Sequence, residues 1–352
     1  MDAFTERVMR KNKSNQSRLP LTISAQYGLV DQITFFNKVV ASTDLSNYYL
    51  LKKGEFAYNK SYSSDYPWGA IKRLDNYDQG ALSSLYICFA PQDNVVSDFI
   101  LQYFESPKWH KGISEIAVEG ARNHGLLNVA VQDFFHTYHY VPKDKKEQIK
   151  ISKLLMLLDE RISTQNKIID KLQSLIRGIA QNIVRNNKPN VCLSECLECK
   201  SSTLQECDVC EQGTYPVYGA NGIVGYLDKY NTEDEAVYII KDGSGVGTVS
   251  YVTGKCSATG TLNTLQAKEG YSLQYLYYLL KVFNFEPYKT GMAIPHIYFK
   301  DYGKAKFFCP SYIEQLQYAQ SLSAIDSKLL VEKNILTSLS MQKQYLLRQM
   351  FI

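Results

Sequence analysis

One long amphipathic stretch, from Glu147 to Val184, constrains the fold of this chain more than any other feature. It contains no proline and a single glycine, and its apolar residues recur at alternating spacings of four and three. This periodicity predicts one side of a coiled coil. Such a helix measures about 55–60 Å at ~1.5 Å per residue, more than the width of a small domain. The predicted seam consists of Ile151, Leu155, Leu158, Ile162, Gln165, Ile169, Leu172, Ile176, Ile179 and Ile183.

A second amphipathic stretch, at 314–351, follows the first at a constant offset of 167 residues. Polar Gln165 coincides with polar Glu332, as expected where a polar pair fixes the register of a coiled coil at some cost in stability. We therefore predict that the two helices pair with each other in antiparallel fashion; the alternative is two unrelated surface helices. The mapped seam consists of Tyr318, Leu322, Ile325, Leu329, Glu332, Leu336, Leu339, Lys343, Leu346 and Met350.

Each predicted helix follows a segment that ends in proline, Pro142 before the first and Pro310 before the second. Proline suits the first turn of a helix and disfavours helix before it, so both helices begin at similar junctions. We expect two globular domains at opposite ends of a rod. The predicted segments are a first domain at 1–144, a central helix at 145–187, a second domain at 188–311 and a C-terminal helix at 312–352.

Both globular segments contain several strand-like runs and one late helical pattern, which is typical of an α+β domain. Each also carries a Tyr-Gly step after its first run, Tyr27-Gly28 and Tyr218-Gly219. We interpret the two domains as divergent copies. The strand-like runs lie at 21–27, 55–62 and 84–90 in the first domain and at 215–226, 236–243, 247–254 and 261–267 in the second; the helical patterns lie at 95–106 and 272–283.

Charge and hydropathy indicate a folded cytoplasmic chain. Hydrophobic residues make up 45% and charged residues 21%, enough to bury a sizeable core, and no apolar run approaches the length of a membrane span. The net charge of +4 excludes a large basic coat. A local basic cluster in the first twenty residues is typical of an arm that contacts phosphates or of a solvated tail. It consists of Arg7, Arg10, Lys11, Lys13 and Arg18.

Five cysteines lie within nineteen residues, and four of them form two CxxC pairs. Such pairs are typical of zinc sites, but only seven residues separate them, which is short for a ribbon with two knuckles. The corresponding part of the first domain contains no cysteine, so we favour reduced thiols and predict no metal, with zinc as the alternative. The pairs are Cys196 with Cys199 and Cys207 with Cys210.

The glycine-rich segment KDGSGVGTVS, at 241–250, does not meet the requirements of a phosphate cradle. No Lys-Ser/Thr pair follows its glycines, and the next residues form a strand-like run instead of a helix. We interpret the segment as a tight turn that approaches a ligand. The sequence contains no methyltransferase, nuclease or helicase constellation, so we predict no catalytic residue.

The order of domain, helix, domain, helix resembles the DNA-specificity subunit of type I restriction-modification enzymes. The segment LLDERISTQNKIIDKLQSLIRGI looks like the central helix of that family, and YPVYGANGIVGY looks like its target-recognition loop. LTISAQYGLV with GEFAYNKSYSSDYPWGAIKRL is similar to another subtype of recognition domain. The first domain begins without a counterpart of the leading strand expected at NVCLSECL, which implies a shortened start or an exchanged cassette.

The resemblance implies a non-catalytic subunit with two target-recognition domains. Each domain would contact one half of a split double-stranded DNA site in the major groove, and the paired helices would set the distance between the halves. Two modification subunits would bring S-adenosylmethionine and adenine methylation, and a restriction subunit would bring ATP and Mg²⁺ with translocation and cleavage. The chain itself would bind no cofactor. The alternatives are a coiled-coil scaffold that spaces two protein-binding modules and an independent nucleotide-using enzyme, for which the sequence shows no site.

The candidate DNA contacts are side chains of the matching loops. Asn and Gln can pair with adenine edges, Lys with guanine or phosphate, and Asp with cytosine. In the first domain they are Ser24, Gln26, Tyr27, Asn59, Lys60, Ser61, Arg122 and Asn123; in the second they are Tyr218, Asn221, Lys241, Asp242, Ser244, Lys289 and His296. Apolar residues off the seam form a candidate partner-binding surface, namely Leu154, Leu157, Ile168 and Leu175. A thicker seam is the alternative for these four.

Overall fold

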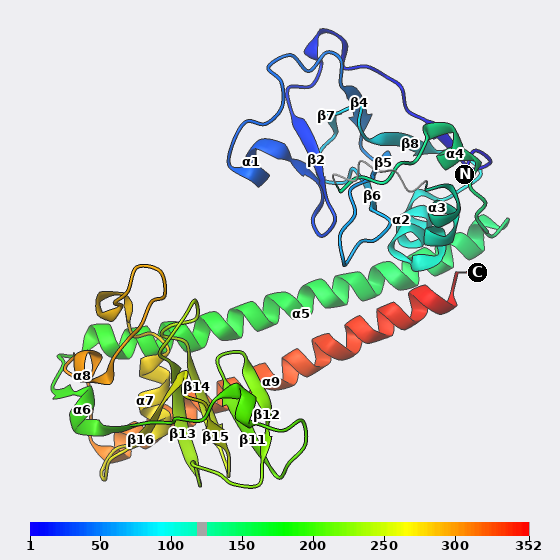
Figure 1. Cartoon of the computed structure of the whole chain (residues 1–352). Coiled ribbons are helices and arrows are strands. Elements are labelled where there is room, and N and C mark those ends of the chain that lie inside the picture. Colours follow the sequence, from blue (N-terminus) through cyan, green and yellow to red (C-terminus); the bar gives the residue numbers. More distant parts are fainter. Residues whose placement is uncertain (118–124, 352) are drawn as a thin grey trace. The chain divides into compact units, whose positions relative to one another are not determined.

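The computed structural model describes residues 1–117 and 125–351 and divides into two compact units. The first unit comprises Met1–Thr164 with Leu336–Ile352, and the second comprises Gln165–Ile335. Each unit contains one globular α+β domain and a part of each of two long helices, α5 (Lys145–Asn186) and α9 (Tyr312–Gln349) (Figure 1). The predicted fold class is confirmed. Within the described residues, no helix is long and apolar enough to cross a membrane.

The first domain contains two four-stranded sheets, with strand orders β1-β8-β5-β6 and β3-β2-β7-β4. All pairs are antiparallel except β2 with β7. The strands are β1 (Thr5–Arg7), β2 (Pro20–Ser24), β3 (Gly28–Asp31), β4 (Tyr49–Lys52), β5 (Phe56–Asn59), β6 (Ala70–Arg73), β7 (Gln79–Leu82) and β8 (Ile87–Pro91). The helices are α1 (Gln32–Phe36), α2 (Ser97–Glu105), α3 (His110–Ile116) and α4 (Val131–His136), and 3-10 turns lie at Lys13–Asn15 and Pro107–Trp109.

The second domain contains the sheets β10-β16-β13-β14 and β12-β11-β15, and the short pair β17-β9. Its strands are β9 (Val191–Cys192), β10 (Leu197–Ser201), β11 (Tyr215–Gly219), β12 (Gly222–Leu227), β13 (Glu235–Ile240), β14 (Val249–Thr253), β15 (Ser257–Ala258), β16 (Leu262–Ala267) and β17 (Lys306–Phe307). Its helices are α6 (Leu193–Cys196), α7 (Leu273–Leu280) and α8 (Phe299–Tyr302), and 3-10 turns lie at Glu206–Asp208 and Glu286–Tyr288. Figure 1 shows α7 beside the β10-β16-β13-β14 sheet.

The two domains follow one plan. In one sheet of each domain an early strand, β1 or β10, pairs with a late strand, β8 or β16, which pairs with the first strand of a central hairpin. In another sheet the equivalent strands, β2 and β11, pair in parallel with β7 and β15. The shared strand order supports the interpretation of the domains as divergent copies, because unrelated domains have no reason to combine the same parallel and antiparallel pairs.

A buried glutamine joins each long helix to its own domain in the same way. In the first unit, Gln148 Oε1 accepts from the backbone N–H of Val96 at the start of α2 (2.7 Å), and its Nε2 donates to the carbonyl of Pro142 (2.7 Å). In the second, Gln315 accepts from Ser272 N–H at the start of α7 and donates to the carbonyl of Pro310, both at 2.9 Å. Buried polar groups are stable only with such partners. The prolines and glutamines that the sequence repeats therefore build equivalent junctions.

The predicted seam is buried or half-buried along α5, and α9 pairs with it in antiparallel fashion inside each unit. In the first unit, Lys343 Nζ donates to Asp159 Oδ1 (2.5 Å). In the second, Gln165 Nε2 donates to the backbone carbonyl (3.0 Å) and the side chain of Glu332. The predicted polar pair thus meets directly. Tyr318 is the exception to the predicted seam, because its side chain is 37% exposed. The adjacent Ala319 is buried in its place.

Three residues of the basic cluster near the N-terminus belong to the folded first domain and not to a solvated tail. Arg7 belongs to strand β1, and Arg10 forms an ion pair with Glu55 (2.7 Å). Lys11 donates to the carbonyl of Asn47 and lies over the ring of Tyr49. The solvated-tail alternative is therefore wrong for these residues, because strand pairing and partners distant in the sequence incorporate them into the first domain.

Candidate nucleic-acid interface

The central hairpin of each domain ends in a loop that contains several candidate DNA contacts. The β5-β6 loop comprises residues 60–69 and the β13-β14 loop comprises residues 241–248. The last paired residues before these loops are Asn59, opposite Ala70, and Ile240, whose backbone exchanges hydrogen bonds with the end of its loop. Lys60 and Lys241 therefore occupy equivalent positions, each as the first residue of its loop. The sequence alone does not show this equivalence, because the two loops differ in length.

In the second domain, the β13-β14 loop is joined to the segment after the 3-10 turn at Glu286–Tyr288. His296 Nδ1 lies 2.5 Å from Asp242 Oδ1. Gly243 N–H donates to the carbonyl of Pro295, and Ile297 N–H donates to the carbonyl of Lys241, both at 3.0 Å. The structure thus brings together two candidates, Asp242 and His296, that lie 54 residues apart in the sequence.

The other candidates of this region differ in exposure. Ser244 is exposed at the tip of the β13-β14 loop. Lys289 is half-buried, and its Nζ forms an ion pair with Glu286 Oε1 (2.6 Å). Lys241 is half-buried as well. Ser244 can therefore contact a ligand as it stands, whereas Lys289 must share its charge with a neighbouring carboxylate.

In the first domain, the β5-β6 loop is joined to a late segment in a similar way. Ser61 forms an isolated antiparallel bridge with Leu126, and Leu127 N–H donates to the carbonyl of Lys60 (2.9 Å). Asn59 Oδ1 accepts from Ser61 N–H (3.0 Å), which fixes one end of this candidate side chain. Two further candidates, Arg122 and Asn123, lie outside the described residues.

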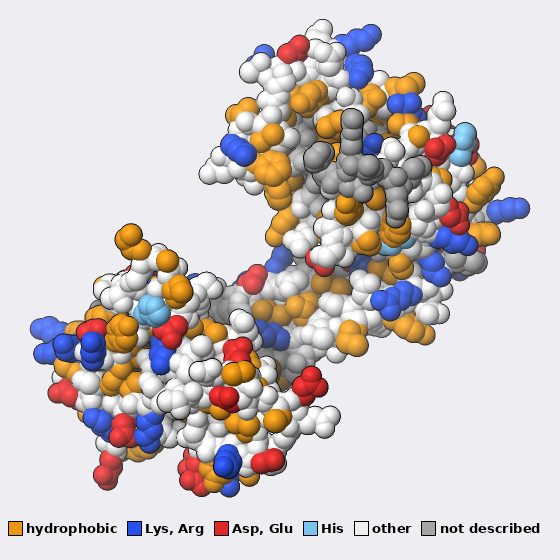
Figure 2. Space-filling view, in the orientation of Figure 1, with side chains coloured by type: hydrophobic (Ala, Val, Ile, Leu, Met, Phe, Trp, Pro, Cys, Tyr) orange, Lys and Arg blue, Asp and Glu red, His pale blue; other side chains and the backbone are white. Residues whose placement is uncertain are grey.

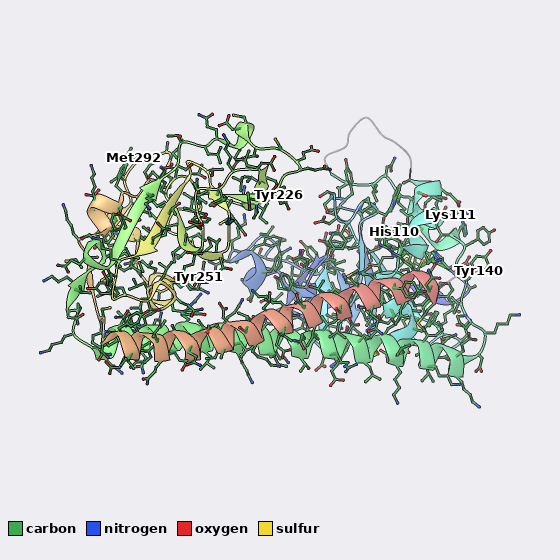
Figure 3. All side chains as sticks on the ribbon, turned by 90° about the horizontal axis from the view of Figure 1, so that it is seen from below. His110, Lys111, Tyr140, Tyr226, Tyr251 and Met292 are labelled. Carbon is green, nitrogen blue, oxygen red and sulfur yellow. The ribbon has the colours of Figure 1, made fainter. Side chains whose placement is uncertain are left out.

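Gln26 and residues of the β5-β6 loop line the same cavity, which has a volume of about 420 Å³. Ion-paired Lys72 and Glu105 (2.6 Å) lie in its wall. His110 also lines it, and burial lowers the pKa of its imidazole. Figure 3 labels His110 in the first unit. The sequence analysis missed the other polar residues of the wall, because they come from segments far apart along the chain; they include Asp65, Tyr66, Gln344 and Arg348.

The two Tyr-Gly steps do not occupy equivalent positions. Tyr27 lies in the β2-β3 turn and is 68% exposed, with Ser24 Oγ accepting from its backbone N–H (3.2 Å). Tyr218 instead lies within strand β11, where it is half-buried and its ring packs on Tyr238 (5.7 Å). Burial raises the pKa of Tyr218. In the second domain, the turn between β11 and β12 consists of Ala220 and Asn221. Of the two candidates in this region, Tyr218 and Asn221, only Asn221 is exposed, as expected of a ligand contact.

The candidate partner-binding residues all lie on the outside of α5. Leu154, Leu157, Ile168 and Leu175 have exposed fractions of 37–49%, so a thicker seam does not cover them. In the first unit, Leu157 also lines a mainly apolar groove of about 470 Å³ together with Val96. Long apolar side chains exposed in a row on one helix are typical of a surface that another protein covers.

The cysteines of the second domain are separated by their local structure. Cys196 is buried, and a hydrogen bond from Cys309 lowers the pKa of its thiol. Cys199 lies in strand β10, where burial raises its pKa to about 11. Cys207 and Cys210 are exposed. In the ranges 1–117 and 125–351, no group of three or more His, Cys, Asp or Glu side chains is arranged to hold a metal ion.

Comparison with known proteins supports one family. Residues 189–341 match the model of the type I restriction modification DNA specificity domain. The EcoprrI specificity subunit of Escherichia coli is 26% identical over 117 residues, 33% of this chain and 29% of that protein. A putative type I restriction enzyme specificity subunit of Haemophilus influenzae is 34% identical over 82 residues, 22% of this chain and 21% of that protein. The matches thus span less than a third of each curated relative.

Two solved structures have similar folds over nearly the whole chain. A type I restriction-modification S subunit from M. genitalium has a TM-score of 0.64 at 18% identity, covering 100% of this chain and 94% of that one. A chain from a study of complex assembly in the type I restriction-modification system has a TM-score of 0.55 at 13% identity, covering 97% and 96%. Residues 189–341 thus resemble a type I specificity domain, the whole chain has the fold of these structures, and the resemblance predicted from the sequence is confirmed.

Proposed function

We propose that this chain, with its type I specificity domain and S-subunit fold, is the non-catalytic DNA-specificity subunit of a type I restriction-modification system. Each domain contacts one half of a split site on double-stranded DNA. The chain itself uses no cofactor. Modification subunits supply S-adenosylmethionine and adenine methylation, a restriction subunit supplies ATP- and Mg²⁺-dependent translocation and cleavage, and the complex works in the cytoplasm.

The observation that carries this proposal is the repeated hairpin loop. Lys60 and Lys241 begin equivalent loops, and each loop is hydrogen-bonded to a late segment of its own domain. The remaining side chains of the two loops differ, as expected of two copies that contact different base sequences. Lys contacts guanine or phosphate, Asp accepts from cytosine N4, and Ser contacts several bases. One scaffold with two different sets of polar side chains suits a bipartite DNA site.

The exposed apolar residues of α5 support docking of modification subunits. Leu154 and Leu157 belong to the first unit, and Ile168 and Leu175 belong to the second. Each unit therefore offers two exposed apolar residues on α5 that a partner subunit can cover. Burial of apolar surface is the dominant favourable contribution to most protein–protein association.

A matched pair of variants tests the proposal. Lys60→Ala and Lys241→Ala are each reconstituted with the cognate modification subunits, and methylated positions are mapped by sequencing genomic DNA. Each variant should change the specificity of one half-site only, since a good base contact gives about 1–3 kcal/mol of discrimination at its own position.

The same experiment separates the alternative function. A scaffold for protein ligands would produce no methylated split motif with either the wild type or the variants. A purified chain that methylates or cleaves DNA by itself would contradict the non-catalytic assignment. Changes in both half-sites from a single substitution would contradict separate recognition by the two domains.

A further inference from the structure

The segment between Thr290 and His296 ends in four consecutive apolar residues that do not pack into the core of the second domain. We name Met292, Ala293, Ile294 and Pro295 the apolar tip. Met292 is fully exposed and Ile294 is 58% exposed. Figure 3 shows Met292 at the outer edge of its domain, away from the long helices, and Figure 2 shows hydrophobic side chains at the surface of that domain.

The apolar tip has a defined conformation. Thr290 N–H donates to the carbonyl of His296 (2.9 Å), and His296 N–H donates back to the carbonyl of Thr290 (2.7 Å). Gly291 has a φ of +89°, and a Cβ at this position would lie 2.4 Å from the carbonyl oxygen of Ile294. Only glycine adopts this backbone without strain. The two hydrogen bonds and the glycine together hold the apolar side chains at the end of a closed turn.

The apolar tip is also fixed to the β13-β14 loop. The carbonyl of Pro295 accepts from Gly243 N–H, Ile297 N–H donates to the carbonyl of Lys241, and the His296 ring meets the Asp242 carboxylate. These contacts fix the C-terminal end of the tip to the loop. A ligand that the loop contacts through Lys241 or Ser244 therefore meets the apolar tip at the same time.

A run of four exposed apolar residues lowers the solubility of a protein. Such a run is therefore expected only where it has a function. Proteins that deform DNA insert Met, Ile, Leu or Pro side chains between base steps, and each inserted side chain unstacks the step and kinks the duplex. We propose that the apolar tip is a wedge that enters the DNA beside the half-site contacted by the second domain. This inference rests on the proposed function and adds to it a means of recognising DNA deformability.

The carboxylates near the tip do not oppose DNA binding. Asp242 and Glu286 are engaged by His296 and Lys289, so neither carboxylate faces the ligand alone. The loop supplies polar groups for base edges, and the tip supplies apolar groups for the space between bases. Pyrimidine–purine steps unstack most easily, so the wedge favours such a step next to the second half-site.

The test uses the complex with modification subunits and a duplex carrying the methylated split site of the wild type. 2-Aminopurine is placed at successive positions flanking the second half-site, and its fluorescence is measured together with the dissociation constant. The wild type should increase the fluorescence at one step. The double variant Met292→Ala/Ile294→Ala should lose that increase and bind at least ten times more weakly, whereas Met292→Leu keeps both properties.

Met341→Ala serves as a control, because Met341 is another exposed methionine, 68% accessible on α9. It should leave both readouts unchanged. Wild-type fluorescence without any increase, or full DNA affinity in the double variant, overturns the wedge. Loss of modification-subunit binding with unchanged DNA affinity also overturns it and assigns the tip to a protein contact. A wild-type complex that selects no split site instead refutes the proposed function, and the wedge with it.

Discussion

The cores of the two units are filled with different aromatic residues, although their strands follow the same order. In the first unit, Phe56 stacks on Phe89 (5.4 Å) and Tyr58 stacks on Phe134 (5.0 Å). In the second, four tyrosines are almost completely buried, and the hydroxyl of each has a hydrogen-bond partner; they are Tyr238, Tyr275, Tyr278 and Tyr302. The first core contains more phenylalanine and fewer buried tyrosines, Tyr58 and Tyr103, whose hydroxyls also have partners. The second core therefore requires the larger set of polar partners.

This difference shows which interactions the common plan requires. The rings of the core can be exchanged, because many combinations of similar volume fill a core. The glutamine junctions at Gln148 and Gln315 have the same partners in both units, because they satisfy backbone groups that every copy of the fold presents. The loops beyond the central hairpins differ most, as expected where each copy meets its own ligand.

The first prediction has the largest expected effect and concerns the two long helices, α5 and α9. If α5 and α9 set the spacing of the two half-sites, one heptad inserted at matching levels in both helices adds about 10 Å at ~1.5 Å per residue. The spacer should then lengthen by about three base pairs at ~3.4 Å each. An insertion in one helix only should break the pairing and abolish recognition.

Selection of sites from a random DNA pool measures this spacer. The longer spacer also rotates one half-site by roughly a quarter turn or more, since a B-DNA turn holds about 10–10.5 base pairs. Some loss of affinity is therefore expected in the double insertion. An unchanged spacer at full affinity would mean that the helices do not set the distance.

The second prediction compares the two glutamine junctions. Gln148→Ala leaves the Val96 N–H and the Pro142 carbonyl without their partner, and Gln315→Ala does the same to Ser272 and Pro310. Each substitution should reduce the unfolding free energy of its own unit by about 2–4 kcal/mol, because buried unsatisfied groups cost about 1–3 kcal/mol each. Hydrogen exchange followed by peptide mass spectrometry reports the units separately. Equal losses in both units from one substitution would contradict independent junctions.

The third prediction contrasts two glycines at the ends of the hairpin loops. Gly69 has a φ of +77°, and a Cβ there would lie 2.2 Å from the backbone oxygen of Asn59. Gly247 has a φ of +90°, but the nearest atoms, Cβ and Cδ2 of Phe285, lie farther away, at 3.1 Å. Gly69→Ala should therefore destabilise its domain by about 3 kcal/mol and Gly247→Ala by about 1–2 kcal/mol, measured by chemical denaturation. A larger loss of stability in Gly247→Ala than in Gly69→Ala would contradict this prediction. It would mean that the Phe285 side chain yields less to a new Cβ than the Asn59 backbone does.

The fourth prediction concerns acid stability. Burial, together with the nearby positive charge of the Met1 amino group, lowers the pKa of His139 to about 3. Nδ1 contacts the Tyr103 hydroxyl (2.8 Å) and Nε2 contacts Thr137 Oγ1 (2.7 Å), so the neutral ring has a partner at each nitrogen. Below pH 6.5 the unfolded chain binds a proton that the folded ring does not. Stability is therefore lost as the pH falls from about 6.5 towards 3, by about 1–2 kcal/mol at pH 5.

The second unit provides the internal control for this effect. Its only histidine is His296, which is partly exposed. Hydrogen exchange at pH 7 and pH 5 should show a loss of protection in the first unit that exceeds any loss in the second. His139→Gln should reduce the pH dependence of the first unit. Unchanged pH dependence in that variant would assign the effect to other groups.

The strands and the helix of each domain were largely predicted from local patterns. The runs at 55–62 and 236–243 became β5 and β13, and the patterns at 95–106 and 272–283 became α2 and α7. The short strand β4 and helix α1 were not predicted, because four or five residues carry little periodicity. The Tyr-Gly comparison was wrong because Tyr27 lies in the turn after β2, whereas Tyr218 lies within strand β11.

The sequence by itself determined the two long helices, their seam and the polar pair Gln165 and Glu332, because residues three and four apart must share one face of a helix. It also determined that several polar loop residues are candidate contacts. Only the tertiary structure decided that Asp242 meets His296, that Lys60 and Lys241 are equivalent, and that the apolar tip is fixed beside a polar loop. The physical reason is that such contacts depend on the register of paired strands and on loop closure between distant segments, which no spacing along the chain encodes.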